Sequence, residues 1–331
     1  MEHVKNIFNT RGLPSLTLAK SRAKSGVSDR VCRSALSRLM SYWKDYTRPA
    51  LMSLACEAVG GDPKLTEEIS ASLILLAAGI DIHDDIIDKS LVKDYGETVL
   101  GARGPEITLL VGDMLFVKGL TAIASSLVSR GFPDNKIKTI LALVEKLFLE
   151  LSDAEAGELR LRRRTDITPR SYLRLTRLKA ADVEAYLKIG SILGGGSTVE
   201  TEALGRYGRS LGMIVILRDD LSDLLDFEEE LPHRIEYEHL PLPILYAVKN
   251  SEYEKKIVSL LHKSKIREED AEKLLKITHE AGGLVSYEKL MKRLVYTCRR
   301  ELNRLPPSEA RSTLRDVVDV TAPPPLSDLE F

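Results

Sequence analysis

The sequence predicts an all-α protein, built as one bundle of long helices. Apolar residues recur at spacings of three and four, which is the period of an α-helix. Two such runs are Ile107-Leu110-Met114-Leu115-Val117-Leu120 and Ile137-Ile140-Leu141-Leu143-Val144-Leu147. Few segments show the alternation of apolar and polar residues, bounded by turns, that indicates a β-strand. Helices therefore account for most of the expected structure.

Glycine and proline interrupt these helical stretches at few places. They cluster at residues 60–63, 101–105, 131–133, 194–196 and 231–243, and in the C-terminal tail. No repeat period and no low-complexity linker divides the chain, so we expect a single domain over residues 1–331. Residues 1–27 form an N-terminal segment, and residues 321–331, which are rich in proline, are expected to be a loose tail.

Composition narrows the class of protein. Hydrophobic residues make up 44% and charged residues 29%, a balance that indicates a folded core and excludes a disordered chain. The net charge of −1 gives no global basic field, so we expect no nucleic-acid partner.

Cysteine usage and hydropathy predict a cytoplasmic protein. Cys32, Cys56 and Cys298 lie far apart, without a CxxC pair for zinc or an even disulfide framework, which favours a reducing compartment. The longest uninterrupted apolar run, Leu73 to Ile80, is too short to cross a bilayer, so no transmembrane segment is expected. The N-terminus lacks the apolar core of a signal peptide.

An aspartate cluster follows the apolar helix that is expected to begin near Glu67. Asp84 and Asp88 are four residues apart and therefore share one helical face, with Asp85 beside them. Asp81 precedes Asp84 by three residues and is placed to join that face. The cluster thus lies at the end of a helix whose apolar composition implies burial.

A second cluster follows the apolar run from Met213 to Leu217. Asp219 and Asp223 repeat the four-residue spacing, with Asp220 between them. About 135 residues separate the two clusters, which suits two helices that face each other across a bundle. One such cluster alone is as readily a solvated surface patch, but the presence of two favours a functional site.

Clusters of this kind require a counter-ion. Two carboxylates about 6 Å apart repel each other by roughly 3 kcal/mol at an effective dielectric constant near 20. Magnesium prefers hard oxygen ligands and usually keeps waters and substrate phosphates in its coordination shell. Two opposed carboxylate walls would therefore hold a diphosphate through shared magnesium ions.

The residues also resemble a known family. Residues 83–90 and 218–223 are similar to the first and second aspartate-rich motifs of the trans-isoprenyl diphosphate synthases, which include farnesyl and geranylgeranyl diphosphate synthases. The resemblance covers roughly residues 30–250. Further similar segments are Arg48-Pro49, Leu54 to Gly61, Gly112-Asp113, Lys179 and Leu240 to Pro243.

The resemblance implies a fold and a reaction. The fold would be all-helical around a central cavity and usually dimeric, either as a homodimer or as a heteromer with another prenyl synthase chain. Three magnesium ions would bridge the aspartates to an allylic diphosphate. Ionisation would leave an allylic cation, which isopentenyl diphosphate attacks before a proton is lost. Magnesium and cationic side chains would stabilise the departing pyrophosphate, and a dry apolar cavity would protect the cation from water.

The resemblance also assigns roles to individual residues. Those that would bind magnesium are Asp84, Asp85, Asp88, Asp219 and Asp223. Asp220 would be either a ligand or a supporting partner of one. Lys93 and Lys179 would contact the allylic diphosphate, and Lys179 would share in catalysis with the aspartates, although a surface lysine is the alternative for Lys179.

The departures from the family pattern concentrate on the isopentenyl diphosphate site, which the family builds from a lysine, two arginines and a histidine. Arg48 is kept, but the other positions hold Asp45, Ala77 and Asp94. A lysine expected after the second cluster falls near His239, and the pair His233-Arg234 together with His239 could replace it.

Three interpretations stay open. In the first, the chain condenses isopentenyl diphosphate with an allylic primer, and Lys44, Arg48 and Arg103 form an altered binding site for isopentenyl diphosphate. Alternatively, it acts as a class I terpene synthase or transfers the prenyl group to another acceptor. As a third possibility, it is a non-elongating subunit of a heteromeric synthase.

Small residues precede the first cluster. Gly79 lies five residues before Asp84, where a bulky aromatic residue in the family limits product length. Together with Ala78, Gly79 would leave a channel open for a product of geranylgeranyl size or longer. The alternative is that these small residues only allow close packing of helices.

Overall fold

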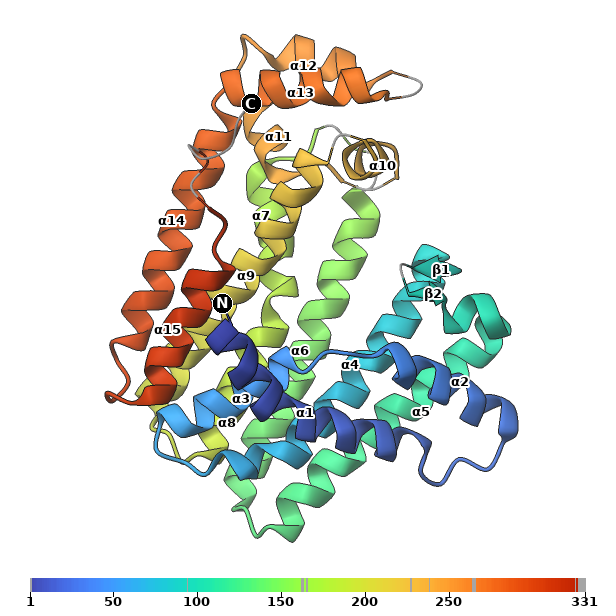
Figure 1. Cartoon of the computed structure of the whole chain (residues 1–331), viewed down its shortest axis with the longest axis vertical. Helices are drawn as coiled ribbons and strands as arrows, with labels where there is room; N and C mark the ends of the chain where they lie inside the picture. The colour runs from blue at the N-terminus through green and yellow to red at the C-terminus, as the bar shows by residue number, and fades with distance from the viewer. Residues whose placement is uncertain are drawn as a thin grey trace. The chain divides into compact units, whose positions relative to one another are not determined.

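The computed structural model describes residues 2–93, 95–161, 164, 166–226, 228–237, 239–263, 266–324 and 326. It is 80% helical, which confirms the predicted all-α class. The helices, in chain order, are α1 (Glu2–Lys24), α2 (Arg30–Tyr42), α3 (Thr47–Ala58), the 3-10 turn η1 (Pro63–Thr66), α4 (Glu67–Asp88), α5 (Val99–Ser129), α6 (Asp134–Leu161), α7 (Pro169–Lys179), α8 (Ala181–Leu193), α9 (Thr198–Leu225), α10 (Glu230–Tyr237), α11 (Leu242–Ala247), α12 (Glu254–Leu261), α13 (Glu268–Glu280), α14 (Gly283–Leu302) and α15 (Glu309–Thr321) (Figure 1). Two short strands, β1 (Val92–Lys93) and β2 (Gly96–Glu97), form an antiparallel hairpin between α4 and α5.

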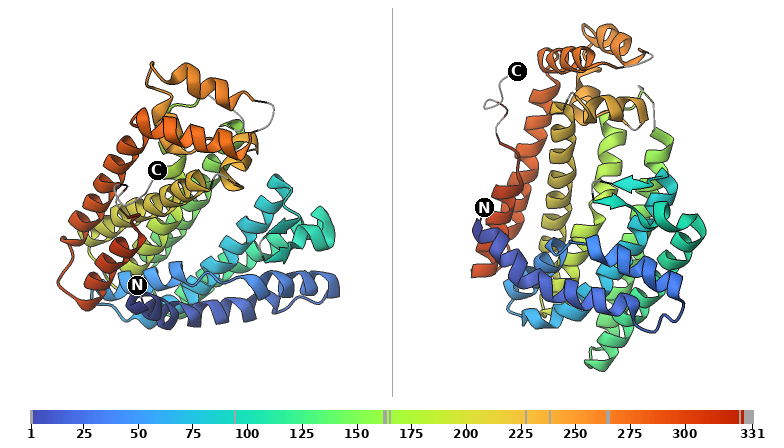
Figure 2. Two further views of the ribbon diagram at one scale, coloured as in Figure 1. Left: turned by 45° about the horizontal axis from the view of Figure 1, so that its top comes forward. Right: turned by 45° about the vertical axis from the view of Figure 1, so that its right-hand side comes forward.

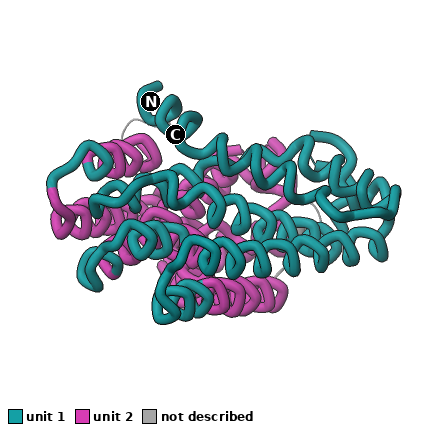
Figure 3. Tube along the Cα trace, turned by 90° about the horizontal axis from the view of Figure 1, so that it is seen from below, with its two compact units in different colours: residues 1–143, 186–201, 307–311 teal, residues 144–185, 202–306, 312–331 magenta. Residues whose placement is uncertain are grey.

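The chain divides into two compact units, each assembled from several stretches of sequence (Figure 3). Unit 1 comprises residues 1–143, 186–201 and 307–311, and unit 2 comprises residues 144–185, 202–306 and 312–331. The expectation of one domain over the whole chain stays a prediction.

The core of unit 1 is built around α4, which packs along α5 and against α1 and α3 (Figure 2). Every residue from Ile69 to Leu76 is buried, so this helix is apolar on all sides, as a core helix must be. Glycines let α5 approach closely, since a Cβ at Gly119 would lie 2.5 Å from the Leu76 side chain. The resulting close packing fixes the direction in which the end of α4 emerges.

Unit 2 is built around α9, which is buried along most of its length. The hydroxyl of Tyr207 donates to the carbonyl of Leu314 at 2.7 Å, and that of Tyr287 donates to the carbonyl of Leu217 at 2.8 Å. These bonds tie α15 and α14 to α9. Glu301 is buried and is paired with three arginines, which compensate its charge.

The expectation that no segment reaches the length of a membrane span was wrong for α5. Among the described residues, α5 is the one helix that is long and apolar enough by length and composition to cross a membrane, with a mean hydropathy of 1.7 over its best window. A core helix passes the same test. The helix is broken by Gly104, whose φ of 78° lies in the left-handed region, just before Pro105.

Candidate active site

Both aspartate clusters lie at the C-terminal ends of helices. The first occupies the last two turns of α4, which ends where Lys89 turns into the left-handed conformation with φ of 56°. The second occupies the last turns of α9, and neither helix has a basic residue in its last turn. Because the C-terminal end of a helix carries partial negative charge, the position of each cluster adds to its need for cations.

Lys93 supplies a cation to the first cluster. The side chain of Asp85 is fully buried, and its Oδ1 lies 2.7 Å from Nζ of Lys93, which also lies 3.4 Å from Oδ1 of Asp81. Burial alone would lower the pKa of Lys93, but its hydrogen bond to Asp85 and the charges of Asp81 and Asp85 outweigh it and raise that pKa. Asp84 is half-buried and Asp88 is exposed, so both are accessible from solvent.

The short loop after α4 places Lys93 beside the end of that helix. The Thr98 hydroxyl donates to the carbonyl of Ser90 at 2.7 Å, and the Thr98 amide donates to the carbonyl of Leu91 at 3.0 Å. The same Thr98 oxygen accepts the Gly101 amide and so caps the start of α5. The β1–β2 hairpin is therefore closed at its base, which holds Lys93 near the end of α4.

The small residues before the first cluster meet an aromatic side chain. A Cβ at Gly79 would lie 3.0 Å from Cε1 of Phe116 on α5. Phe116 also stands edge-on to the ring of His83, with a centroid separation of 5.1 Å, and His83 covers Gly112. The space that Gly79 leaves is therefore bordered by a bulky ring from the neighbouring helix, which sequence spacing alone did not indicate.

Arg234 supplies a cation to the second cluster. Asp220 is buried, and its Oδ1 accepts a hydrogen bond of 2.7 Å from Nη1 of Arg234, while its Oδ2 accepts one from the hydroxyl of Tyr172. The same Nη1 of Arg234 donates to Oδ2 of Asp223 at 2.7 Å. One guanidinium nitrogen therefore bridges two of the three aspartates. Burial and the neighbouring Asp220 raise the pKa of Tyr172, so its hydroxyl stays a donor.

The hydrogen bonds continue from Arg234 through His239 to α6. Nη2 of Arg234 donates to Nδ1 of His239 at 2.9 Å, and Nε2 of His239 lies 3.5 Å from Glu158. Glu158 is also paired with Lys179. Burial alone would raise the pKa of Glu158, but the hydrogen bond from His239 and the charge of Lys179 lower it. Lys179 thus belongs to the same network as the second cluster.

The residues expected to grip isopentenyl diphosphate have different partners within unit 1. Arg48 is paired with Asp45, the residue that the resemblance predicts to stand in place of a lysine. Arg103 donates to the Ser34 hydroxyl at 3.1 Å, and Lys44 lies close enough to Lys20 to lower the pKa of that residue, although burial is the larger cause. Asp94, predicted to be the other acidic replacement, lies outside the described residues.

Tyr172 and Glu158 were missed by the sequence analysis, and nothing in their local sequence indicates a role. Tyr172 on α7 contacts Asp220 directly, and Glu158 on α6 is linked to the second cluster through His239 and Arg234. For Arg234 and His239 the sequence did supply a signal, because both follow the second cluster in the segment where a basic residue was expected.

The carboxylates fit a divalent ion that is shared with a phosphate ligand. Within the described ranges, no three metal-ligating side chains converge closely enough to hold an ion unaided. Magnesium usually takes only one or two carboxylates and completes its shell with waters and substrate phosphates. Two sets of hard oxygen donors at the negative ends of helices match that requirement.

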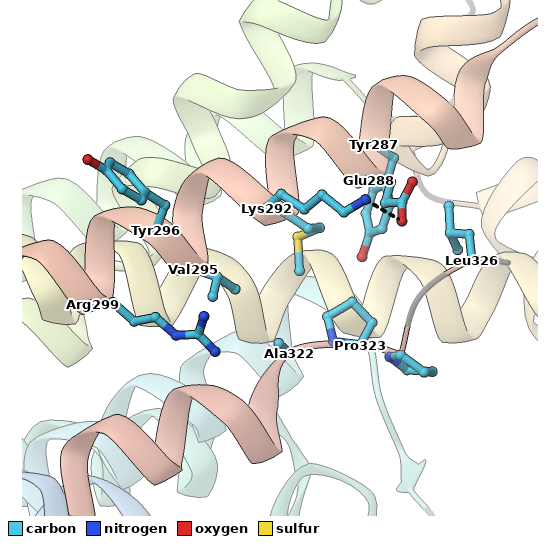
Figure 4. A pocket seen from close by; sticks show the side chains of 11 residues that line it. Tyr287, Glu288, Lys292, Val295, Tyr296, Arg299, Ala322, Pro323 and Leu326 are labelled. Atoms are coloured by element: carbon cyan, nitrogen blue, oxygen red, sulfur yellow. Dashed lines mark ion pairs between the residues drawn. The ribbon is translucent and has the colours of Figure 1, made fainter. Parts of the chain in front are cut away.

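A groove in unit 2 contains none of the predicted site residues. It has a volume of about 260 Å³ and lies between α14 and residues Ala322, Pro323, Pro324 and Leu326 (Figure 4). The charged residues of its rim have partners, since Lys292 lies 2.9 Å from Glu288 and Arg299 lies 2.6 Å from Asp319. The groove is therefore not assigned to the chemistry of the two clusters.

The sequence has relatives among characterised proteins. A short chain isoprenyl diphosphate synthase of Methanothermobacter thermautotrophicus is 31% identical over 218 residues, which cover 65% of this chain and 66% of that relative's length. A geranylfarnesyl diphosphate synthase of Aeropyrum pernix is 26% identical over 80% of this chain and 85% of its own length. Solanesyl-diphosphate synthase 2 of Oryza sativa subsp. japonica, a chloroplastic protein, is 25% identical over 88% of this chain and 72% of its own.

The fold has counterparts among solved structures. Geranylgeranyl pyrophosphate synthetase from Pyrococcus horikoshii Ot3 superimposes with a TM-score of 0.86 over 97% of this chain and 98% of its own, at 22% identity. At that identity the likeness concerns the fold alone. The family model of polyprenyl synthetases matches residues 31–278, which is most of the chain. The chain therefore belongs to the polyprenyl synthetase family, whose members are isoprenyl diphosphate synthases.

Proposed function

We propose that this enzyme joins an allylic diphosphate to isopentenyl diphosphate and releases a longer trans-polyprenyl diphosphate. The observation that carries the proposal is the pair of aspartate clusters, each at the negative end of a long helix and each facing a basic side chain, in a member of the polyprenyl synthetase family. Members of this family use allylic and isopentenyl diphosphates as substrates, and typically a divalent metal.

The proposed roles follow from burial and contacts. Asp84, Asp85 and Asp88 on α4, with Asp219 and Asp223 on α9, hold magnesium, of which we propose three ions. Asp220 belongs to the predicted metal set, and its buried contacts support the alternative in which it positions other groups. Bound magnesium would neutralise the charge that builds on the departing pyrophosphate.

Two lysines complete the allylic half of the site. Lys93 and Lys179 are both paired with carboxylates, and the raised pKa of Lys93 keeps its ammonium group charged. Each presents a cation that an incoming diphosphate can attract. The apolar residues of α4 and α5 exclude water from the allylic cation, which would otherwise be quenched.

The acceptor half of the site supports two candidate reactions. In the first, Lys44, Arg48 and Arg103 bind isopentenyl diphosphate. A specific contact favours the second candidate, because the pairing of Arg48 with Asp45 places a negative charge where an anionic acceptor would bind. The second candidate is a reaction of the allylic diphosphate without isopentenyl diphosphate, either as a class I terpene synthase or with another acceptor. A non-elongating subunit of a heteromeric synthase is the third.

The assay with labelled isopentenyl diphosphate separates these candidates. The protein is incubated with magnesium, labelled isopentenyl diphosphate and each allylic primer in turn, and the products are sized. We expect incorporation of label into longer diphosphates. Release of pyrophosphate without incorporation of label would favour the second candidate. The absence of any reaction with every primer would favour a non-elongating subunit of a heteromeric synthase.

Phe116 gives the proposed product length a test. Because the Phe116 ring borders Gly79, it sets the free space near the first cluster. We propose products of geranylgeranyl size or longer, and we expect Phe116→Ala to lengthen the main product by at least one isoprene unit while Phe116→Leu changes it less. An unchanged product distribution for Phe116→Ala would mean that the chain does not grow past Gly79 and Ala78.

We propose that the enzyme is a homodimer that associates through α5. Leu110, Val117 and Val128 recur at seven- and eleven-residue spacing on this helix and are at least half exposed. An exposed apolar helix face of this kind is typical of a subunit interface. Sedimentation equilibrium should give twice the chain mass, and Val117→Glu should shift it to the monomer. A wild-type monomer that associates only with a second synthase chain would favour a heteromer.

The three cysteines support a reducing, cytoplasmic location. Cys32, Cys56 and Cys298 are buried and unpaired by disulfides, and burial raises the pKa of Cys56 and of Cys298 to about 12. Thiols in that state are unreactive. Fractionation of cells that express the tagged protein would test the location.

A further inference from the structure

We propose that Arg234 is a built-in cation of the second aspartate cluster and competes with a divalent ion for Asp223. The inference rests on the proposed function, in which this cluster binds metal. It concerns what the protein itself contributes before any metal arrives. The observation is the double contact of Nη1 of Arg234, which lies 2.7 Å from Asp220 and 2.7 Å from Asp223.

Burial distinguishes the two partners of Arg234. The side chains of Arg234 and Asp220 are 7% and 3% exposed, whereas that of Asp223 is 30% exposed. Removing either member of a buried ion pair leaves an uncompensated charge, which is strongly unfavourable. Asp220 is therefore the permanent partner that holds Arg234, and Asp223 is the partner that can be exchanged for a metal ion.

His239 fixes the orientation of the guanidinium. Arginine has only donors, so Nδ1 of His239 accepts in the 2.9 Å contact with Nη2 of Arg234, and Nε2 on the other side of the ring faces Glu158. With Asp220 on one nitrogen and His239 on the other, Arg234 is held at both ends of its planar fork.

The third aspartate of the cluster is in a different situation. Asp219 is 60% exposed and pairs at 3.1 Å with Arg218, which is itself 42% exposed. Solvent screens such a pair, so it contributes little. Arg218 and Arg234 thus place the same charge beside the same cluster, but only the charge of Arg234 is held in place and shielded from water.

The consequence is weak metal binding by the second cluster in the absence of substrate. A metal ion that binds Asp223 meets a fixed positive charge that already occupies Oδ2 of that carboxylate. Added pyrophosphate brings further negative charge to the cluster and offsets the positive charge of Arg234, so metal and pyrophosphate should bind the cluster together. Arg234 would act as a positioning residue that couples the two.

The test measures Mn²⁺ binding by electron paramagnetic resonance in protein whose first cluster is disabled by Asp84→Asn and Asp88→Asn. In that background, Arg234→Gln combined with Asp220→Asn removes one charge of each sign. Without pyrophosphate, we expect this variant to bind Mn²⁺ about tenfold more tightly than the parent, which carries only Asp84→Asn and Asp88→Asn. The matched control, Arg218→Gln, should change the affinity by less than about twofold.

Further variants control for a folding defect. They also distinguish failure of the proposed role of Arg234 from failure of the proposed metal binding by the second cluster. Arg234→Met with Asp220→Leu replaces the buried pair by apolar side chains and should give the same gain in affinity, whereas Arg234→Lys should bind Mn²⁺ as weakly as the parent. Unchanged or weaker binding in both double variants would overturn the role of Arg234. If the parent binds no Mn²⁺ even with pyrophosphate, the proposed function of the second cluster fails instead.

Discussion

The counter-charge of the first aspartate cluster comes from Lys93, five residues beyond its last aspartate, whereas that of the second comes from Arg234, eleven residues beyond. A closed hairpin holds Lys93 beside α4. Arg234 lies on a separate helix, α10, and its position depends on His239 and Asp220. Both arrangements compensate carboxylates at the negative end of a helix.

The two cations carry the same charge but differ in burial and in how they bind carboxylates. Lys93 has a compact ammonium group that is 32% exposed and can turn toward a new anion. Arg234 is almost fully buried and joins two carboxylates through one nitrogen. The first cluster therefore pairs its buried carboxylate with a cation that stays partly solvated, whereas the second pairs its buried carboxylate with a cation that is itself buried. This difference predicts unequal responses to the same substitutions.

The largest expected effect is the loss of turnover when either cluster is broken. Asp84→Ala and Asp219→Ala should each lower turnover by about a thousandfold or more, since a metal ion contributes several kcal/mol to stabilising the leaving charge. Product formation with magnesium is the measurement, and circular dichroism should show unchanged helix content. If only one variant loses activity, then only one cluster holds catalytic metal, and full activity in both would refute the metal assignment.

The next largest effect is a difference in the free energy of unfolding between variants that lack Arg234 and variants that lack Lys93. Arg234→Gln should lower the free energy of unfolding by about 3–5 kcal/mol, because the buried Asp220 would lose its compensating charge. Lys93→Gln should cost less, about 1–2 kcal/mol, because burial raises the pKa of Asp85, which can take up a proton and so lose its charge when Lys93 is removed. Urea unfolding of both variants provides the comparison. Equal losses would show that the burial of Arg234 does not distinguish the clusters.

The smallest effect concerns pH and the far end of the Arg234 network. The pKa of Glu158 lies below its ordinary value of 4.5, so its interactions stabilise the fold above that pH and are lost as the pH falls through and below it. Glu158→Gln should therefore lower the Tm at pH 7 and reduce its decline toward pH 3. Asp166→Asn, which breaks an exposed pair with Arg164, is the control and should leave the curve nearly unchanged. A steeper decline in Glu158→Gln would contradict the network.

Local sequence was sufficient to predict the helical class and the positions of both clusters. The four-residue spacing of Asp84 and Asp88, and of Asp219 and Asp223, depends only on helix period, and both helices formed where apolar periodicity indicated them. That the two clusters face each other stays a prediction, as do the roles of individual residues. The open channel at Gly79 is likewise untested, and the adjoining Phe116 ring comes from another helix.

Periodicity and spacing thus determined which helices form and which of their faces carry carboxylates, because both properties arise within a few turns of one chain segment. They did not determine which charge compensates which carboxylate. Tyr172 on α7 and Arg234 on α10 contact the second cluster, and Glu158 on α6 is linked to it through His239. Such contacts depend on how helices pack, and packing depends on side-chain shapes across the whole core.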